Sequence, residues 1–183
     1  MRTKSVAFYT LGCKLNQYET EGIRESFINH GYQVVPFQES ADIYVINTCT
    51  VTSKSAARSR KLVRRAHRRS PGCQVVVVGC YSEVQPDEVA EIEGADLVLG
   101  NTEKPRTVEY LEDTESRTVN AQQGECSKDA GFEAFDIDEL AQHSRAFIKI
   151  QEGCDVFCSY CIIPYARNPL KSRTPESVIG QVQ

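Results

Sequence analysis

Three cysteines near the end of the chain have the spacing with which proteins hold an iron–sulfur cluster. Cys154, Cys158 and Cys161 form a Cys-x3-Cys-x2-Cys run directly after Gly153. Three thiolates this close in sequence can wrap one four-iron cluster and leave one iron without a protein ligand, open to a substrate. A zinc site is the alternative, but structural zinc normally takes four protein ligands and the sequence offers no fourth nearby. The run therefore predicts a 4Fe-4S cluster.

A second cysteine trio is visible only against the elements expected around it. Cys13, Cys49 and Cys80 each follow a short apolar segment within a few residues. If those segments are parallel strands, their carboxyl ends share one edge of a sheet, where ligands bind. Gly12 and Gly79 would let the backbone approach a bulky ligand closely. A buried free cysteine is often only a small apolar side chain, but three at equivalent positions favour a second site.

The remaining two of the eight cysteines are expected to be non-ligands. Cys73 lies at the opposite end of its expected strand, next to a Pro-Gly turn, and Cys126 lies in an acidic segment. Neither position reaches the shared edge of the sheet in this topology.

One expected helix carries charges of a single sign. No Asp or Glu occurs from residue 43 to residue 82, although the whole chain has a formal charge of -4. Of the 21 basic residues, eight lie on the helix expected at 53–69: Lys54, Arg58, Arg60, Lys61, Arg64, Arg65, Arg68 and Arg69. Solvated helix faces usually mix both signs, so this helix predicts binding to the phosphates of RNA or to another polyanion. A smaller basic group comprises Arg167, Lys171 and Arg173.

Apolar periodicity and turn residues predict the elements that position these groups. Short β-branched or aromatic runs, suited to strands buried on both faces of a parallel sheet, occur at 5–9, 32–36, 43–47, 74–78, 95–99 and 146–150. Helix patterns with recognisable ends lie at 16–29, 53–69 and 86–92, and another starts near Thr174. The alternation predicts an α/β fold with a doubly wound, mostly parallel sheet.

Composition divides the chain into three parts. Residues 1–112 carry the strand–helix alternation, residues 113–144 are acidic and polar with few large apolar side chains, and residues 145–183 open with a new strand. We expect an α/β domain, a linker and the start of a second domain. No apolar run approaches the ~18 residues that cross a bilayer, and no secretory signal opens the chain. We therefore expect a cytoplasmic protein without a membrane partner.

Four stretches of the sequence resemble the radical S-adenosylmethionine methylthiotransferases. They are TLGCKLNQYET at 10–20, VINTCTVT at 45–52, VGCY at 78–81 and IKIQEGCDVFCSYCIIP at 148–164. Lys14 and the segments 17–20 and 49–52 are most similar to the branch that converts N6-threonylcarbamoyladenosine, beside the tRNA anticodon, to its 2-methylthio form. Relatives that act on isopentenyladenosine usually have Gln after the first cysteine and Cys-x-x-Arg at the second. The branch that modifies a ribosomal-protein aspartate diverges at the same places.

The resemblance implies a role for each cysteine trio. One 4Fe-4S cluster, whose open iron carries the sulfur to be methylated and inserted, would be held by Cys13, Cys49 and Cys80. A second 4Fe-4S cluster, which chelates S-adenosylmethionine and reduces it to a radical, would be held by Cys154, Cys158 and Cys161. Tyr160 and Ile162 would flank the adenine of that cofactor. The implied partners are tRNA and an external electron donor such as flavodoxin or ferredoxin; the sulfur donor stays open.

The chain departs from the family's pattern in two respects. The family commonly has Arg-Gly-x-x-Arg-Ser-Arg after the triple-cysteine loop, whereas Asn168 stands at the glycine position here. A β/α barrel needs roughly 200 residues or more, and the residues after 144 supply only its first strand, cluster loop and part of a helix. We therefore expect an N-terminal fragment that contains the truncated start of a radical SAM β/α barrel and cannot complete turnover alone.

Other functions fit parts of the same pattern. A methylthiotransferase acting on isopentenyladenosine would need a dry pocket, whereas a threonylcarbamoyl carboxylate needs a cation, for which Lys14 and Arg167 are the candidates. A zinc-binding RNA-binding module would use the cysteines and the basic helix without catalysis. An electron-transfer protein would hold clusters through four protein ligands each, which two separate trios disfavour.

Overall fold

The parallel sheet of the N-terminal domain is clear in a computed structural model that describes residues 2–113, 121–122, 135 and 147–182. Its strand order is β2-β1-β3-β4-β5-β6, and the strands are β1 (Ser5–Thr10), β2 (Gln33–Val35), β3 (Ile43–Thr48), β4 (Gln74–Gly79), β5 (Leu97–Leu99) and β6 (Ala121–Gln122). Every pair in it is parallel. From β1 the sheet grows in one direction to β2 and in the other to β3, which is a common doubly wound order. The α/β fold predicted for this domain is confirmed.

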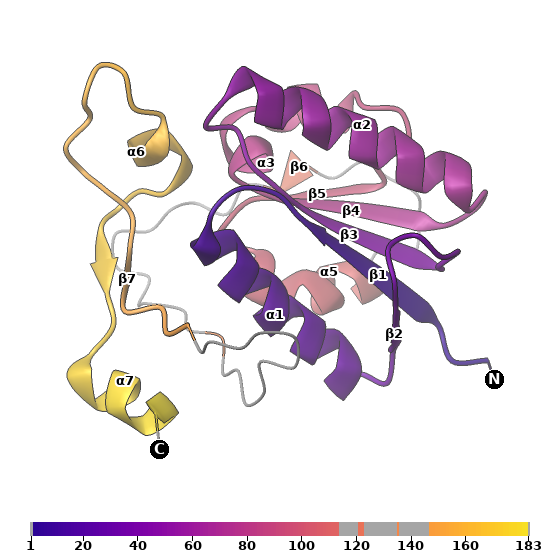
Figure 1. The fold of residues 1–183 in the computed structure, drawn as a ribbon, viewed down its shortest axis with the longest axis horizontal. Coiled ribbons are helices and arrows are strands. Elements are labelled where there is room, and N and C mark those ends of the chain that lie inside the picture. Colours follow the sequence, from indigo (N-terminus) through magenta and orange to yellow (C-terminus); the bar gives the residue numbers. More distant parts are fainter. Residues whose placement is uncertain (1, 114–120, 123–134, 136–146, 183) are drawn as a thin grey trace.

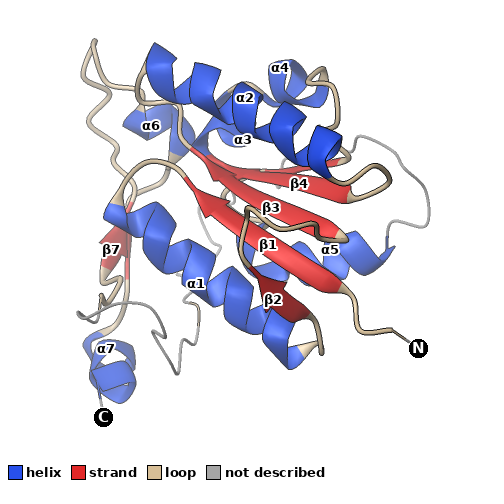
Figure 2. Ribbon diagram, turned by 45° about the vertical axis from the view of Figure 1, so that its right-hand side comes forward, coloured by secondary structure: helices blue, strands red, loops and turns tan. Residues whose placement is uncertain are grey.

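Helices cover both faces of the sheet. One face carries α1 (Lys14–Asn29), α5 (Thr107–Asp113) and the 3-10 turn η1 (Lys104–Arg106). The other face carries α2 (Ser53–Arg69), α3 (Cys80–Val84) and α4 (Pro86–Ala90), and the two layers are visible in Figures 1 and 2. Because both faces are covered, β3 is buried along its whole length.

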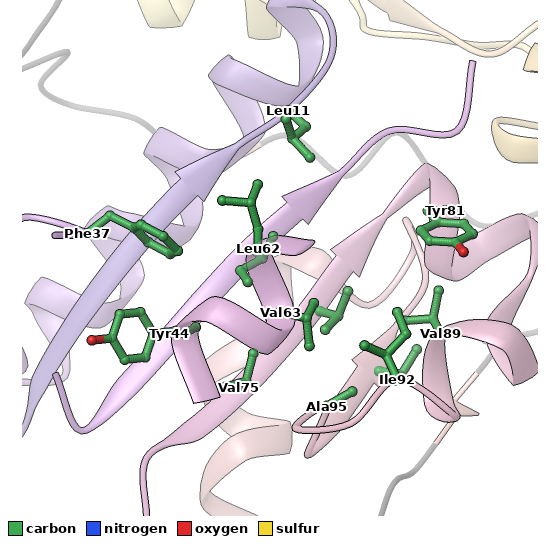
Figure 3. Packing of buried hydrophobic residues seen from close by; sticks show 14 of the residues in the cluster. Leu11, Phe37, Tyr44, Leu62, Val63, Val75, Tyr81, Val89, Ile92 and Ala95 are labelled. Atoms are coloured by element: carbon green, nitrogen blue, oxygen red, sulfur yellow. The ribbon is translucent and has the colours of Figure 1, made fainter. Parts of the chain in front are cut away.

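Alternate residues of the central strand contribute to two apolar cores. Tyr44 of β3 belongs to the cluster under α2, with Leu62 and Val63 of that helix, and Figure 3 shows these side chains together. Val45, the next residue along the strand, belongs to the cluster under α1, with Phe27. This period of two is what a strand buried between two helical layers requires.

The described C-terminal part lies beyond the carboxyl ends of the sheet strands (Figures 1 and 2). It contains an antiparallel pair, β7 (Gln151–Glu152) and β8 (Lys171–Ser172), and the helices α6 (Ile163–Ala166) and α7 (Pro175–Val182). That this part begins a β/α barrel stays a prediction. No helix in the described ranges is both long and apolar enough to span a membrane.

The structure differs from the sequence-based elements in several places. The strand predicted at 146–150 is wrong, because residues 147–150 are irregular. The strand lies at 151–152 instead, where the two residues pair with the two residues of β8. The predicted helix at 16–29 begins at Lys14 instead. The short α3 was not expected, and it starts on Cys80 directly after β4.

The expected linker is not uniformly a spacer. Most of 113–144 lies outside the described residues, but two described points belong to the α/β domain. β6 extends the sheet by pairing with β5. Phe135 is 7% exposed, its ring lies 6.4 Å from that of Tyr18, and its carbonyl oxygen accepts a hydrogen bond from the Tyr18 hydroxyl at 3.1 Å. The domain boundaries themselves stay a prediction.

Candidate functional site

The first cysteine trio lies at the carboxyl edge of the parallel sheet. Cys13 follows β1 and caps α1, Cys49 follows β3, and Cys80 begins α3 after β4. These three strands are neighbours, and the connections diverge between β1 and β3, where open α/β sheets bind ligands. All three residues are free thiols; Cys13 is exposed, and the other two are buried. The topology therefore brings three thiols to one edge.

Two glycines allow the loops of this trio to approach one another. Gly12 has a φ of +100°, and a Cβ there would lie 2.8 Å from Cβ and 3.1 Å from Sγ of Cys49. Gly79 has a φ of +108°, and a Cβ there would lie 2.5 Å from Oδ1 of Asn47 and 2.7 Å from the carbonyl oxygen of Thr48. Because this backbone region favours glycine and the space is occupied, a side chain at either position would push the loops apart.

A buried asparagine ties the first two of these loops together. Nδ2 of Asn16 donates to the carbonyl oxygen of Leu11 at 2.8 Å and to that of Thr48 at 3.0 Å. The Asn47 amide donates in turn to the Asn16 carbonyl oxygen at 3.0 Å. The two acceptor carbonyls lie within two residues of Cys13 and Cys49, so Asn16 fixes the chain on which both thiols are carried.

The second trio lies on one irregular loop between β7 and α6. Cys154, Cys158 and Cys161 are half-buried free thiols. The N–H of Cys161 donates to the carbonyl oxygen of Cys158 at 2.9 Å, which closes a tight turn between them. Phe157 adopts a φ of +48°, and its ring packs edge-on against Tyr165 with 5.5 Å between centroids. The loop that carries the three thiols is therefore folded back on itself.

The donor chemistry at both trios fits a 4Fe-4S cluster with one open iron, because three thiols on one loop or at one sheet edge are what such a cluster takes. Burial lowers the pKa of Lys104. At Arg167 burial would also lower the pKa, but the Glu19 carboxylate outweighs it and the pKa is raised. Cys80 interacts electrostatically with both cations. Cations at this place would offset the negative charge of a thiolate-bound group. Within the described residues, no three His, Cys, Asp or Glu side chains are arranged to hold a single metal ion. The ligand roles stay predictions.

A buried ionic cluster lies between the two trios. Glu19 of α1, 3% exposed, accepts from Nζ of Lys104 at 2.5 Å and lies 3.4 Å from Nζ of Lys149. Both terminal nitrogens of Arg167 donate to its carboxylate, at 2.7 and 2.8 Å. Glu152 of β7 pairs with Lys149 at 2.7 Å and with Arg167 at 3.2 Å. We call these five side chains the ionic cluster; they join the α/β domain to the C-terminal part.

The charges of the ionic cluster depend on one another. Burial alone would raise the pKa of Glu19, but Lys104, Arg167 and Lys149 outweigh burial and hold that pKa well below its usual range. Burial alone would lower the pKa of Arg167, but the Glu19 carboxylate outweighs it and raises that pKa well above its usual value. Both groups are therefore charged at neutral pH, and removing one partner would leave a buried charge uncompensated.

Arg167, a candidate from the sequence for contact with RNA or with a substrate carboxylate, is buried in the structure, and that role stays a prediction. Its side chain is 4% exposed, and its guanidinium also donates to Oδ1 of Asn16 at 2.8 Å. The partner Glu19 lies 148 residues earlier in the chain, so no local pattern indicates the pair. Of the other two members of that basic group, half-buried Lys171 lines a cavity of about 50 Å³ beside the ionic cluster, and Arg173 donates to Ser177 at 2.8 Å.

The basic residues of α2 fall into two sets. The exposed set, here called the basic stripe, repeats at four and three residues along one helix face: Lys54, Arg58, Lys61, Arg65 and Arg68. The partly buried set is Arg60, Arg64 and Arg69. Arg60 donates to the Tyr81 hydroxyl at 2.6 Å and to Glu88 at 2.8 Å, and Arg69 donates to the Phe37 carbonyl oxygen at 2.6 Å. The five residues of the basic stripe are exposed, and one of them, Arg58, also donates to the Tyr9 hydroxyl at 2.7 Å.

The other residues singled out from the sequence lie apart from these groups. Tyr160 is 90% exposed and Ile162 is half-buried just before α6, so their contacts with a cofactor stay predictions. Cys73 is buried at the amino end of β4, away from the sheet edge that carries the trio. Cys126 lies outside the described residues. Asn168 does not have a positive φ, so the backbone at this position does not require the family's glycine.

Sequence reasoning missed the ionic cluster. In the sequence Glu19 is only one residue of a family motif, although the helix pattern holds a signal. It lies on α1 three residues after Asn16 and four before Ile23, both of which are buried, so it shares their face. A carboxylate on the buried face of a helix needs a cationic partner. Only the fold shows that the partners come from η1 and the C-terminal part.

Comparisons with known proteins place these features in a family context. The sequence profile described as "Uncharacterized protein family UPF0004" matches residues 5–100. A Bacillus subtilis protein named threonylcarbamoyladenosine tRNA methylthiotransferase is 43% identical over 98% of this chain and 40% of its own length. A ribosomal protein uS12 methylthiotransferase of Desulfitobacterium hafniense is 35% identical over 98% of the chain and 41% of its own length.

A third relative modifies a different nucleoside. The tRNA-2-methylthio-N(6)-dimethylallyladenosine synthase of Anaplasma marginale is 30% identical over 99% of this chain and 40% of its own length. The chain thus spans about two fifths of the length of each of these relatives.

We predict that Glu19→Gln destabilises the chain by about 3–5 kcal/mol at pH 7, because it leaves buried cations without their carboxylate. A Glu whose folded pKa is depressed contributes stability that is full above its unfolded pKa, about 4.3, and is lost as pH falls through the folded value. The difference in free energy of unfolding between Glu19→Gln and the unsubstituted chain should therefore be constant between pH 7 and about pH 5. It should become smaller below about pH 4. Urea unfolding followed by circular dichroism at several pH values measures it.

Glu109→Gln is the matched control, since Glu109 makes an exposed pair with Arg106. It should cost at most about 0.5 kcal/mol. Equal losses in the two variants, or a difference that does not narrow in acid, would contradict the charged state assigned to Glu19.

Proposed function

Because the chain belongs to the family UPF0004, whose curated relatives reported above are methylthiotransferases, we propose that its protein adds a methylthio group to C2 of N6-threonylcarbamoyladenosine in tRNA. The identity to the Bacillus protein named for that substrate carries the proposal: 43%, against 35% and 30% for the relatives named for a ribosomal protein and for dimethylallyladenosine. All three values refer to nearly the whole chain, so the difference is not one of coverage.

We assign each cysteine trio one 4Fe-4S cluster, with S-adenosylmethionine at the second. When bound, these groups supply the radical and sulfur chemistry that an unactivated adenine C2–H requires and that no side chain can supply. The chain itself holds and orients the groups. Cys13, Cys49 and Cys80 would hold the first group at the sheet edge, where Gly12 and Gly79 let the loops come close. Cys154, Cys158 and Cys161 would hold the second, on the folded-back loop.

Lys14 is our candidate for recognition of the threonylcarbamoyl carboxylate. It is exposed, it directly follows Cys13, and its Nζ lies 5.3 Å from the centroid of the Phe147 ring. That cation–π contact would hold the ammonium beside the first trio. Arg167, the other cation considered, is committed to Glu19. An isopentenyl group, which is purely apolar, would gain nothing from an ammonium at this place.

We predict that Lys14→Gln lowers 2-methylthiolation of threonylcarbamoyladenosine by about tenfold, since a hydrogen bond to a charged group is removed. The whole protein is expressed in a host without its own methylthiotransferases, and the tRNA nucleosides are analysed by mass spectrometry. Lys4→Gln, at an exposed position before β1, is the control and should not change the product. Accumulation of 2-methylthio-isopentenyladenosine with threonylcarbamoyladenosine unmodified would refute the substrate assignment.

The basic stripe of α2 is our candidate for binding tRNA phosphates. Its five cations lie on one exposed face without an intervening carboxylate, since no Asp or Glu occurs on that helix. Thr52 caps the helix by accepting from the Ser55 N–H at 3.1 Å, and Leu62, Val63 and Ala66 bury the opposite face. The stripe is therefore a rigid row of charges, which suits a backbone polyanion.

We predict that Lys61→Gln, Arg65→Gln and Arg68→Gln together weaken tRNA binding. They should also reduce the slope of log affinity against log salt by roughly one for each phosphate that the helix no longer neutralises. The control removes the same charge from the partly buried set, through Arg60→Gln, Arg64→Gln and Arg69→Gln. It should change the slope much less. Equal effects of the two triple variants would mean that net charge, and not the stripe, attracts the RNA.

A further inference from the structure

We propose that Arg167 is a positioning residue that locks the loop of the second trio against the loops of the first, so that groups held by the two trios face each other. The use of such a lock rests on the function proposed above. The lock itself rests on contacts within this chain. Arg167 would thus contribute to the site without being a ligand of either cluster.

The main chain of Arg167 closes the loop that carries the second trio. Its carbonyl oxygen accepts from the N–H of Cys154 at 3.1 Å, and its N–H donates to the carbonyl oxygen of Ile163 at 2.8 Å. A Cβ on Gly153, whose φ is +85°, would lie 2.8 Å from the carbonyl oxygen of Arg167. The first cysteine of the trio is therefore fixed directly on Arg167.

The side chain of Arg167 reaches the loops of the first trio. Its two terminal nitrogens donate hydrogen bonds to the Glu19 carboxylate at 2.7 and 2.8 Å, and one of them also donates to Oδ1 of Asn16 at 2.8 Å. Nδ2 of that asparagine holds the carbonyl oxygens of Leu11 and Thr48. The guanidinium thus connects with the chain just before Cys13 and Cys49 through a single intermediate residue.

The third cysteine of the first trio is connected through the residue that precedes Arg167. Nδ2 of Asn101 donates to the carbonyl oxygen of Ala166 at 2.6 Å and lies 3.9 Å from Sγ of Cys80. All three loops at the sheet edge are therefore linked to two successive residues at the end of α6, Ala166 and Arg167. Figures 1 and 2 show α6, which ends at Ala166, beside the carboxyl ends of the strands.

Only an arginine can make this set of bonds. The planar guanidinium donates to both oxygens of one carboxylate and to a further acceptor in fixed directions, whereas a lysine ammonium is a compact point charge. Lys104 and Lys149 already supply positive charge to Glu19, so charge alone does not explain a third cation. The geometry points to orientation of the two loops as the contribution of Arg167.

Amide hydrogen exchange of the metal-free chain, read by mass spectrometry, tests the lock. In Arg167→Gln, exchange in the segments 11–16, 49–52 and 151–169 should accelerate by about tenfold or more, while β3 and β4 exchange as before. Arg167→Lys keeps the positive charge but not the planar guanidinium, and it should accelerate exchange in the same segments to a smaller extent. It also carries the test if the glutamine variant fails to fold. Arg173→Gln, in the same C-terminal part, should change none of these segments.

Unchanged exchange at the three segments, or equal acceleration throughout the chain, would overturn the lock. Iron content after anaerobic reconstitution separates this failure from failure of the proposed function. Arg167→Gln should keep the iron of the unsubstituted chain, since no cysteine is altered. If the unsubstituted chain binds no iron but the exchange pattern is observed, the function fails and the lock stands. If iron is bound and the pattern is missing, the function stands and the lock fails.

Discussion

Burial of the Glu19 carboxylate is the constraint on which the rest of the structure depends. A carboxylate with 3% of its side chain exposed is stable only when ionic partners and hydrogen bonds replace water. Here the partners come from two directions: Lys104 from the α/β domain, and Lys149 and Arg167 from the C-terminal part. Neither direction alone gives the carboxylate its full set of bonds. The ionic cluster therefore joins the two parts near the cysteine loops.

The position of Glu19 in α1 gives this constraint its consequence for the site. The helix begins directly after Cys13, and Asn16 and Glu19 follow on its buried face. Asn16 holds the backbone of two loops, and Glu19 holds the arginine that closes the loop of the second trio. Rigid support of this kind is what a site that aligns two reacting groups needs. The parallel sheet places one trio, and the ionic cluster ties the part of the chain that carries the other trio to the α/β domain.

The sequence predicted the features that depend on local pattern. The bounds of α2 were predicted correctly from the helix pattern at 53–69, and in the structure Thr52 caps its start. The parallel sheet followed from short β-branched runs. Features that depend on distant partners were not predicted. A short run of apolar residues favours a strand at 146–150, yet Lys149 within that segment turns into the ionic cluster. Arg167 has the local pattern of a surface cation, because its partner lies in a different part of the chain.

The magnetic interaction between two reduced clusters is the measurement that tests this account most directly. The chain is reconstituted anaerobically with iron and sulfide, assayed for metal, reduced and examined by electron paramagnetic resonance. We expect about eight irons per chain, four for each trio, and a spectrum broadened or split by coupling between the clusters. A spectrum that is the plain sum of the two single-trio variants would contradict the claim that the trios face each other. Bound zinc in place of iron would contradict the assignment of the clusters.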